Sequence, residues 1–366
     1  MTRIPVKPGR YFPPVAIPPG FTIEMILSDK GWTQAELARR MDRPVQAVNE
    51  LIKGKKEITA ETAIELERVL GSPASFWLRL EANHRENVAR LERLKAEEEE
   101  VKKTRNFPYA EMVRYGLVPP TRVLRERFEH VLAFLGVACF DALEKNLQVV
   151  FRKTGKLPVS FEKLAVWLRW GELKMQGLKL GQFSKSKLRG RLHEIRSLTL
   201  EKPDTFVPKL EKIGEETGVA FLFVREFKGF PVTGVTRWSN GNPLVQVNLR
   251  YKTNDHLWFT VFHEIGHVLN SQKKQVFIDV KGGGNGRNSE EDTADEFACR
   301  TLVPKDVFDE LLGLHRIFEA AVRRYSTRLG IAPGILVGML QHEGKIRYKD
   351  LNGLKITYKW EIAHSA

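Results

Sequence analysis

Two histidines with a glutamate between them carry the clearest chemical signal in this sequence. His263 and His267 are four residues apart, and Glu264 directly follows the first of them. On a helix this spacing brings both imidazoles to one face, where they can bind a single ion. Bound zinc lowers the pKa of a coordinated water toward ~7, and an adjacent carboxylate can accept its proton. The pattern therefore predicts a Zn²⁺ site for metal-assisted hydrolysis, with Glu264 as the general base.

The sequence around these residues predicts the helix that this chemistry requires. Thr253 or Asn254 can cap its start, and apolar residues recur along it at helical spacing. Before it, VAFLFV, VTGVTRW and PLVQVNL are short β-branched and aromatic segments separated by Gly, Pro and Asn, which is typical of strands. VFIDV is a further candidate strand, and KGGGNGRNS is expected to be a flexible loop. The last strand before the helix, PLVQVNL (Pro243–Leu249), is the candidate edge strand for pairing with an extended substrate.

A second helix, expected from about Glu290, can supply the third metal ligand. Glu291 and Asp295 are four residues apart and would share a face. Two histidines and one glutamate leave the fourth zinc position for water, and Asp295 can accept a hydrogen bond from one ligand histidine. Glu290 is the competing ligand, but its companion four residues on is Ala294, which offers no such support. The alternative for the whole segment is a solvated acidic run, and Cys299 is expected to be a buried free thiol.

These two segments together resemble the ImmA/IrrE family of zinc peptidases. The family signature joins His-Glu-x-x-His to a helix of the form Glu-x-x-Ala-Asn-x-Phe-Ala that ends in Leu-x-x-Pro. The matching positions are His263, Glu264, His267, Glu291, Ala294, Phe297, Ala298 and Pro304. Asp295 stands where the family usually has Asn, a departure that removes no ligand. Over roughly residues 206–355 the resemblance implies a zincin-like fold and proteolysis of transcriptional repressors, but the substrate's identity does not transfer.

The N-terminal sequence has the layout of a helix-turn-helix. Gln34 to Met41 is expected to form the scaffold helix, Asp42 and Arg43 the turn, and Pro44 to Ile52 the recognition helix. Gln46 and Asn49 would point outward, and Gln and Asn side chains can read adenine edges in the major groove. The basic residues that follow are expected to contact phosphates; they are Lys53, Lys55 and Lys56.

The stretch from Thr33 through Trp77 resembles XRE-type helix-turn-helix domains, and in particular the HigA-like antitoxins. The likeness extends to the Ser-Pro-x-x-Phe-Trp ending at Ser72, Pro73, Phe76 and Trp77. It implies binding to operator DNA, usually as a homodimer on an inverted repeat.

The composition of the chain limits the class of protein that it can be. The chain has 366 residues, 42% hydrophobic and 28% charged, as in ordinary soluble globular proteins. Two distant cysteines, no apolar run of about 20 residues and no secretory signal predict a cytoplasmic protein without a membrane span.

The net charge of +14 is unevenly distributed. Gly20–Gly71 holds eight Lys/Arg against nine Asp/Glu, whereas Lys145–Leu198 holds thirteen Lys/Arg against three Glu. The basic middle is either a solvated helical face or a phosphate-backbone contact surface.

The sequence as a whole predicts an α+β multidomain protein with an all-α helix-turn-helix, a helical middle and a C-terminal zincin-like domain. The expected segments are a proline-rich leader (1–19), the helix-turn-helix (20–80), a charged linker helix (81–106), a basic helical region (107–205), the metallopeptidase core (206–304) and a helical extension (305–366).

The expected function is that of a DNA-binding, antitoxin-like transcriptional regulator with a zinc-dependent peptidase domain. Its protein substrate would be a regulatory protein such as a repressor or toxin. Two alternatives stay open: a HigA-like repressor whose zinc domain is only a sensor, and a peptidase whose helix-turn-helix is a protein-interaction module. An intact Glu264 speaks against the first alternative, because a structural metal site needs no base.

Overall fold

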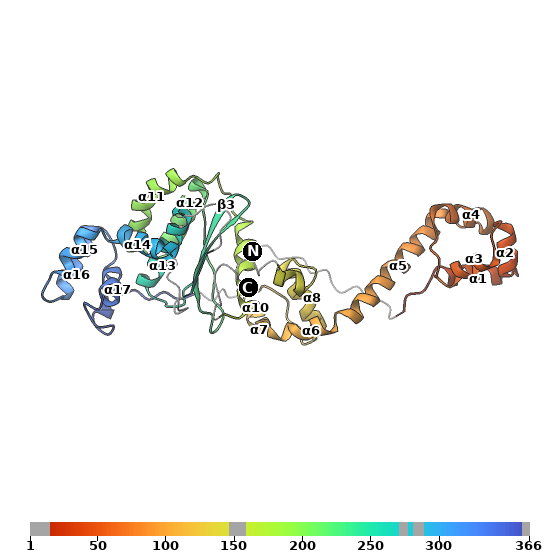
Figure 1. Ribbon diagram of the computed structural model, residues 1–366, viewed down its shortest axis with the longest axis horizontal. Coiled ribbons are helices and arrows are strands. Elements are labelled where there is room, and N and C mark those ends of the chain that lie inside the picture. The colour runs from red at the N-terminus through yellow and green to blue at the C-terminus, as the bar shows by residue number, and fades with distance from the viewer. Residues whose placement is uncertain (1–14, 146–158, 271–276, 281–288, 361–366) are drawn as a thin grey trace. The chain divides into compact units, whose positions relative to one another are not determined.

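The computed structural model describes residues 15–145, 159–270, 277–280 and 289–360, which divide into two units (Figure 1). One unit comprises Met1–Thr104 with Arg122–Phe128, and the other comprises Arg105–Thr121 with Glu129–Ala366. The first unit is helical and the second combines helices with one sheet, so the predicted α+β multidomain class is confirmed. The expected leader lies mostly outside the described residues, as do most of the glycine-rich loop and the last residues of the tail.

The first unit is built from short helices followed by a long one. They are α1 (Gly20–Lys30), α2 (Gln34–Arg40), α3 (Val45–Ile52), α4 (Ala60–Leu70), α5 (Ala74–Ala96) and α6 (Glu98–Lys103). The Thr33 hydroxyl caps α2 by accepting from the Glu36 amide at 3.2 Å, as Thr residues commonly do at helix starts. Fully buried Trp77 joins the core residues of α1 to α4, so the start of α5 belongs to the same small domain.

The charged linker helix is interrupted, where the sequence predicts one continuous helix to Lys103. Residue Glu97 separates α5 from α6, and its side chain is largely buried. Its carboxylate accepts from Arg93 and from Arg125, the latter at 2.6 Å. A glutamate held by two arginines is not part of a solvated charge run, and sequence periodicity does not reveal such a partner 28 residues away.

The second unit contains a four-stranded sheet with strand order β1-β3-β2-β4. The strands are β1 (Ala220–Phe223), β2 (Val232–Ser239), β3 (Asn242–Val247) and β4 (Phe277–Val280). Strand β3 pairs in parallel with β1 and antiparallel with β2. The prediction that Pro243–Leu249 forms an edge strand is therefore wrong, because β1 covers its second edge. Among the described strands, β4 is the edge on the side of β2.

Helix α10 (Phe161–Met175) lies on one face of this sheet, and α12 (Pro203–Thr217) and α13 (Asn254–Asn270) lie on the other (Figure 1). The helices outside this layer are α11 (Lys185–Ser197), α14 (Ser289–Leu302), α15 (Lys305–Leu312), α16 (Glu319–Leu329) and α17 (Pro333–His342). On one face, Gln246 of β3 donates to the Trp167 carbonyl of α10 at 2.8 Å. On the other face, its neighbours Val245 and Val247 pack in the core with α12 and α13. The short helices α7 (Tyr109–Arg114) and α8 (Leu124–Leu135) complete the described order.

A hydrophobic core joins the helices of the second unit from α11 to α17 with the sheet. It includes Leu188 of α11, Trp258 and Phe262 of α13, Leu302 of α14 and Leu336 of α17. The sequence analysis placed segment boundaries after residues 205 and 304. Residues before and after each of these boundaries nevertheless belong to the same hydrophobic core. Within the described residues, no helix is both long and apolar enough to cross a membrane.

Candidate functional site

Helix α13, which carries the His-Glu-x-x-His motif, is anchored at its first two residues by the C-terminal tail. The Asn254 amide donates to the Ile356 carbonyl at 2.9 Å, and the Ile356 amide donates to Asn254 Oδ1 at 3.0 Å. Next to them, Lys355 Nζ lies 2.6 Å from the Asp255 carboxylate, and both side chains are nearly buried. Asn254 thus uses its carboxamide to hold the tail, and helix α13 starts from a fixed position.

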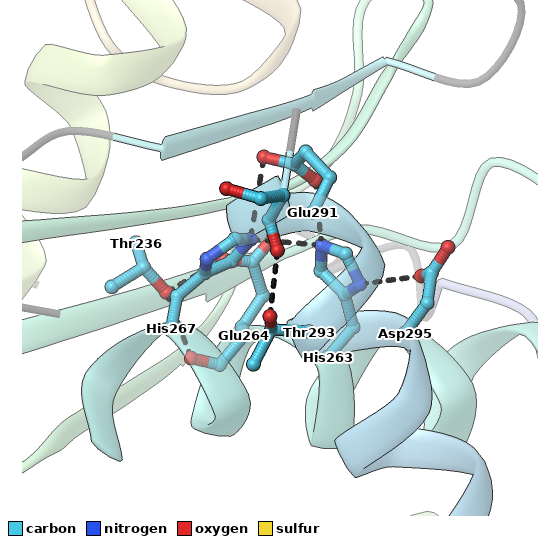
Figure 2. Close-up of polar contacts among 8 residues, drawn as sticks. Thr236, His263, Glu264, His267, Glu291, Thr293 and Asp295 are labelled. Carbon is cyan, nitrogen blue, oxygen red and sulfur yellow. Dashed lines mark hydrogen bonds and ion pairs between the residues drawn. The ribbon is translucent and has the colours of Figure 1, made fainter. Parts of the chain in front are cut away.

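Three side chains from two helices converge beside the sheet (Figure 2). His263 Nε2 and His267 Nε2 are 3.0 Å apart on α13. The Glu291 carboxylate of α14 lies 3.2 Å from His263 Nε2 and 3.5 Å from His267 Nε2. One donor atom from each of the three residues lies within 4.8 Å of the others.

This donor set fits zinc. Tetrahedral zinc at ~2.0–2.1 Å from each nitrogen would hold two imidazole nitrogens about 3.3 Å apart, close to the observed spacing. His263 Nδ1 lies 2.8 Å from Asp295 Oδ1. Because a carboxylate only accepts, Nδ1 carries the proton and Nε2 presents its lone pair to the group. Lone pairs and a carboxylate that converge in this way are suited to a shared cation.

The Glu291 carboxylate has the charge that a metal ligand needs. Burial raises its pKa, but the His263 and His267 imidazoles beside the carboxylate outweigh that effect and lower the pKa to about 2. Glu291 is therefore anionic at neutral pH. Glu290, the competing candidate, is exposed and does not belong to the group of converging donors. The assignment of Glu291 as ligand and of Asp295 as its supporting residue remains a prediction that this geometry favours.

Glu264 is fully buried on the side of α13 that faces β2 (Figure 2). The Thr236 hydroxyl donates to Glu264 Oε2 at 2.6 Å. A Cβ atom built on Gly234 would lie 2.3 Å from Glu264 Oε1, so only glycine leaves room for the carboxylate there. Sequence reasoning did not single out Gly234 or Thr236. The available signal was a glycine inside the strand VTGVTRW, which often marks a close approach of other atoms.

Cys299 is a half-buried free thiol rather than a fully buried one. Burial, together with nearby Asp295, raises the pKa of this thiol to about 11. A thiol that stays protonated is a poor metal ligand, and Cys299 lies outside the group of converging donors.

The N-terminal unit displays the residues expected to read DNA, with one change at the helix start. Pro44 precedes α3 as its cap instead of lying in its first turn. Gln46 is exposed, and its amide donates to Glu50 Oε1 at 3.2 Å. Asn49 is half-buried and donates to Gln34 Oε1 at 3.3 Å. The three lysines that follow α3 are all exposed; they are Lys53, Lys55 and Lys56. Their roles in DNA binding remain predictions.

The basic middle of the chain is only partly described, because residues 146–158 lie outside the described ranges. In the rest of it, Arg191 pairs with Glu194 and Glu216, and Arg169 pairs with Glu172. Part of the positive charge is thus neutralised by local partners. The phosphate-contact reading of this region remains a prediction.

Comparisons with known families agree with this architecture. A family model described as "Helix-turn-helix" matches residues 24–77, and the peptidase M78 model, described as "IrrE N-terminal-like domain", matches residues 212–336. The chain therefore belongs to the XRE-type helix-turn-helix family through its N-terminal domain, and its C-terminal part is an IrrE/ImmA-like domain of the peptidase M78 family. The two resemblances drawn from the sequence are confirmed.

Individual relatives match part of the chain. The chain is 35% identical over 68 residues to the Virulence-associated protein A of Dichelobacter nodosus, covering 18% of this chain and 67% of that protein. It is 35% identical over 83 residues to the uncharacterized HTH-type transcriptional regulator YddM of Escherichia coli K12. That match covers 21% of this chain and 88% of that protein. A solved HigA-family addiction module antidote protein from Coxiella burnetii matches at 26% identity and a TM-score of 0.20. The match covers 25% of this chain and 92% of that protein.

Proposed function

We propose that this protein is a DNA-binding transcriptional regulator whose C-terminal domain is a zinc-dependent peptidase. The observation that supports it most is the joint position of the donors and the base. His263, His267 and Glu291 converge at hydrogen-bonding distances, and the buried Glu264 carboxylate is held one residue from the first donor. A purely structural metal site would have no use for that carboxylate.

Zinc held by His263, His267 and Glu291 would supply Lewis-acid activation of water and of the scissile carbonyl. Glu264 accepts the proton of the attacking water and later passes it to the nitrogen of the leaving amine. The Thr236 hydroxyl, 2.6 Å from Glu264 Oε2, fixes the orientation of the carboxylate during both transfers. Asp295 holds the His263 ring through Nδ1 and so keeps its other nitrogen directed at the donor group.

Strand β4 replaces the wrongly predicted edge strand as the place where an extended substrate would pair. Its residues lie opposite β2, with Thr236 paired to Phe277 and Gly234 to Asp279. These β2 residues are the ones that contact Glu264. A peptide added to the outer edge of β4 would therefore run beside the base, in the manner of β-strand addition.

The partners follow from the two domains. The helix-turn-helix would bind an operator, as a homodimer on an inverted repeat, through Gln46, Asn49 and the exposed lysines after α3. A matching relative is itself named as an HTH-type transcriptional regulator. The peptidase would act on a regulatory protein such as a repressor or a toxin.

The proposed activity is tested by replacing Glu264 with glutamine, which preserves size and removes the proton acceptor. Proteomes of cells that express wild type or Glu264→Gln are compared under several stresses, including DNA damage. We expect cleavage products that occur only with the wild type, and these would identify the substrate. If the two proteomes match and the chain itself is never cut, the zinc domain acts as a sensor within a repressor.

A further inference from the structure

A polar hollow lies one helical turn from Glu264, at the N-terminal end of α13. It is lined by Thr233 of β2, by the loop of residues 248–253 that follows β3, and by His256 and Thr260 of α13. None of the described residues that line it is acidic. The proposed peptidase chemistry gives this hollow no role.

The hollow is continuous with the face that holds the base. Gly234 lies against both regions, since a Cβ atom built on it would be 2.8 Å from Thr260 Cγ2 and 2.3 Å from Glu264 Oε1. Thr260 precedes Glu264 by four residues, which is ~6 Å along a helix. His256 precedes His263 by seven residues, or ~10 Å. A substrate that reaches the base can therefore also reach this hollow.

The lining of the hollow carries positive charge. Arg250 donates to the Phe230 carbonyl and lies over the ring of Tyr251, with its guanidinium carbon 5.5 Å from the ring centroid. Tyr251 in turn stacks on His256 at 4.5 Å between centroids. These contacts hold Arg250 in place beside the hollow, and the exposed Lys252 adds a second permanent cation to the same loop.

Asp255 lies next to His256 in the chain, but its charge is already compensated, because its carboxylate is paired with Lys355 at 2.6 Å. The start of α13 adds the partial positive charge of its backbone amides at the same end.

Thr260 offers a hydroxyl to a ligand in the hollow. The residue is only 6% exposed and its methyl group lies against Gly234. Its hydroxyl is not among the fully buried, unpartnered polar atoms of the described residues, and Thr260 lines the hollow, so a polar group of a bound molecule can reach this hydroxyl.

We propose that this hollow is a substrate subsite that takes the carboxylate of an Asp or Glu side chain. Arg250 and Lys252 attract the carboxylate, and the Thr260 hydroxyl donates to it. An extended peptide advances ~3.3 Å per residue, so the acidic residue lies two to three positions from the scissile bond. This inference rests on the proposed peptidase activity and names the class of substrate for it.

The test uses full-length zinc-loaded protein and a degenerate peptide library blocked at both ends, with cleavage sites read by mass spectrometry. Wild type should enrich Asp and Glu at one position, two or three residues from the cut. Lys252→Glu should reduce that enrichment about fivefold, because a partly exposed ion pair seldom contributes more. Thr260→Val should reduce it while Thr260→Ser restores it. Lys345→Glu, which changes an exposed lysine outside the hollow, should leave it unchanged.

The possible outcomes separate this inference from the proposed activity. Cleavage without acidic preference, or with a preference that both variants keep, would overturn the subsite and leave the peptidase intact. If wild type cleaves no peptide, the peptidase proposal fails. In that case immobilised Glu264→Gln protein is used to capture the same library. Capture of acidic peptides that depends on Lys252 and Thr260 would support the subsite, and capture without that dependence would refute it.

Discussion

At the scale of single residues, the candidate site depends on two positions that the motif itself does not contain. Gly234 leaves space for the Glu264 carboxylate, and Thr236 donates to it. The five-residue motif predicted the imidazoles and the base because the helical period alone places them on one face. It could not predict Gly234 or Thr236, because they come from a strand about 30 residues earlier and meet Glu264 only through packing.

Gly234→Ala should therefore impair the site without removing a ligand. The added methyl group would overlap Glu264 Oε1 and crowd Thr260, so we expect a loss of about 1–3 kcal/mol in unfolding free energy. Any Glu264-dependent cleavage should fall more than zinc content does. Chemical denaturation and elemental analysis measure the two effects.

Gly190→Ala is the matched control. Gly190 lies in α11, and a Cβ atom there would meet nothing within 4 Å. Alanine should stabilise that helix by up to about 1 kcal/mol. Equal losses of stability in both variants would show that Gly234 has no special contact with the base.

At the scale of elements, local patterns predicted the helices well and the sheet order poorly. Helices α2 and α3 and the active-site helix follow caps and apolar spacing that are visible in the sequence. The position of β3 inside the sheet depends on its parallel pairing with β1, a contact across more than 20 residues that no local pattern encodes. The contact of Glu97 with Arg125, beside the break between α5 and α6, likewise joins residues that are distant in sequence.

The sequence also did not predict that the C-terminal tail holds the start of α13. This contact can be tested through the buried ion pair between Asp255 and Lys355. Lys355→Met would leave the Asp255 carboxylate buried without its cation. Burial raises the pKa of Asp255, but the bonds from Lys355 and Thr253 lower it below its ordinary value, so Asp255 is charged at neutral pH. We expect a loss of about 3–5 kcal/mol in unfolding free energy at pH 7.

That loss should shrink on acidification. The stabilisation from a carboxylate with a lowered pKa is complete above its unfolded value and disappears as the pH falls through the folded value. Chemical denaturation of wild type and Lys355→Met, from pH 7 down through the folded pKa of Asp255, measures this change in unfolding free energy. Lys345→Met, at an exposed position, should change stability by less than about 0.5 kcal/mol. A Lys355→Met protein as stable as this control would mean that the tail does not anchor α13.

Helix α3 carries a prediction about DNA. The double variant Gln46→Ala with Asn49→Ala should lose about 1–3 kcal/mol of specific binding for each bidentate base contact removed. Both side chains make only intramolecular hydrogen bonds to exposed or half-buried neighbours, so the fold should persist. Binding of wild type and of the double variant to the DNA upstream of the protein's own gene is measured by titration. Unchanged sequence preference in the double variant would show that α3 is not the recognition helix.

At the scale of the whole molecule, one chain combines a near-neutral helix-turn-helix with an IrrE/ImmA-like domain in a protein of net charge +14. Both family resemblances were evident from the sequence, because each rests on a compact run of characteristic residues. The extent of the second unit was not, because its core also recruits α11, from a segment whose sequence carries no family signature. The shared core means that the proposed metal centre depends on most of the chain from α11 onward.

The most direct test of the proposed metal centre is the zinc content of purified full-length protein, measured by elemental analysis after dialysis. Wild type should hold about one zinc per chain, the number that three converging protein ligands can bind. Glu264→Gln and Glu290→Ala should retain it, because neither side chain belongs to the donor group. His263→Ala and Glu291→Ala should lose it. Zinc retained in full by Glu291→Ala, or lost in Glu290→Ala alone, would contradict the metal centre described here.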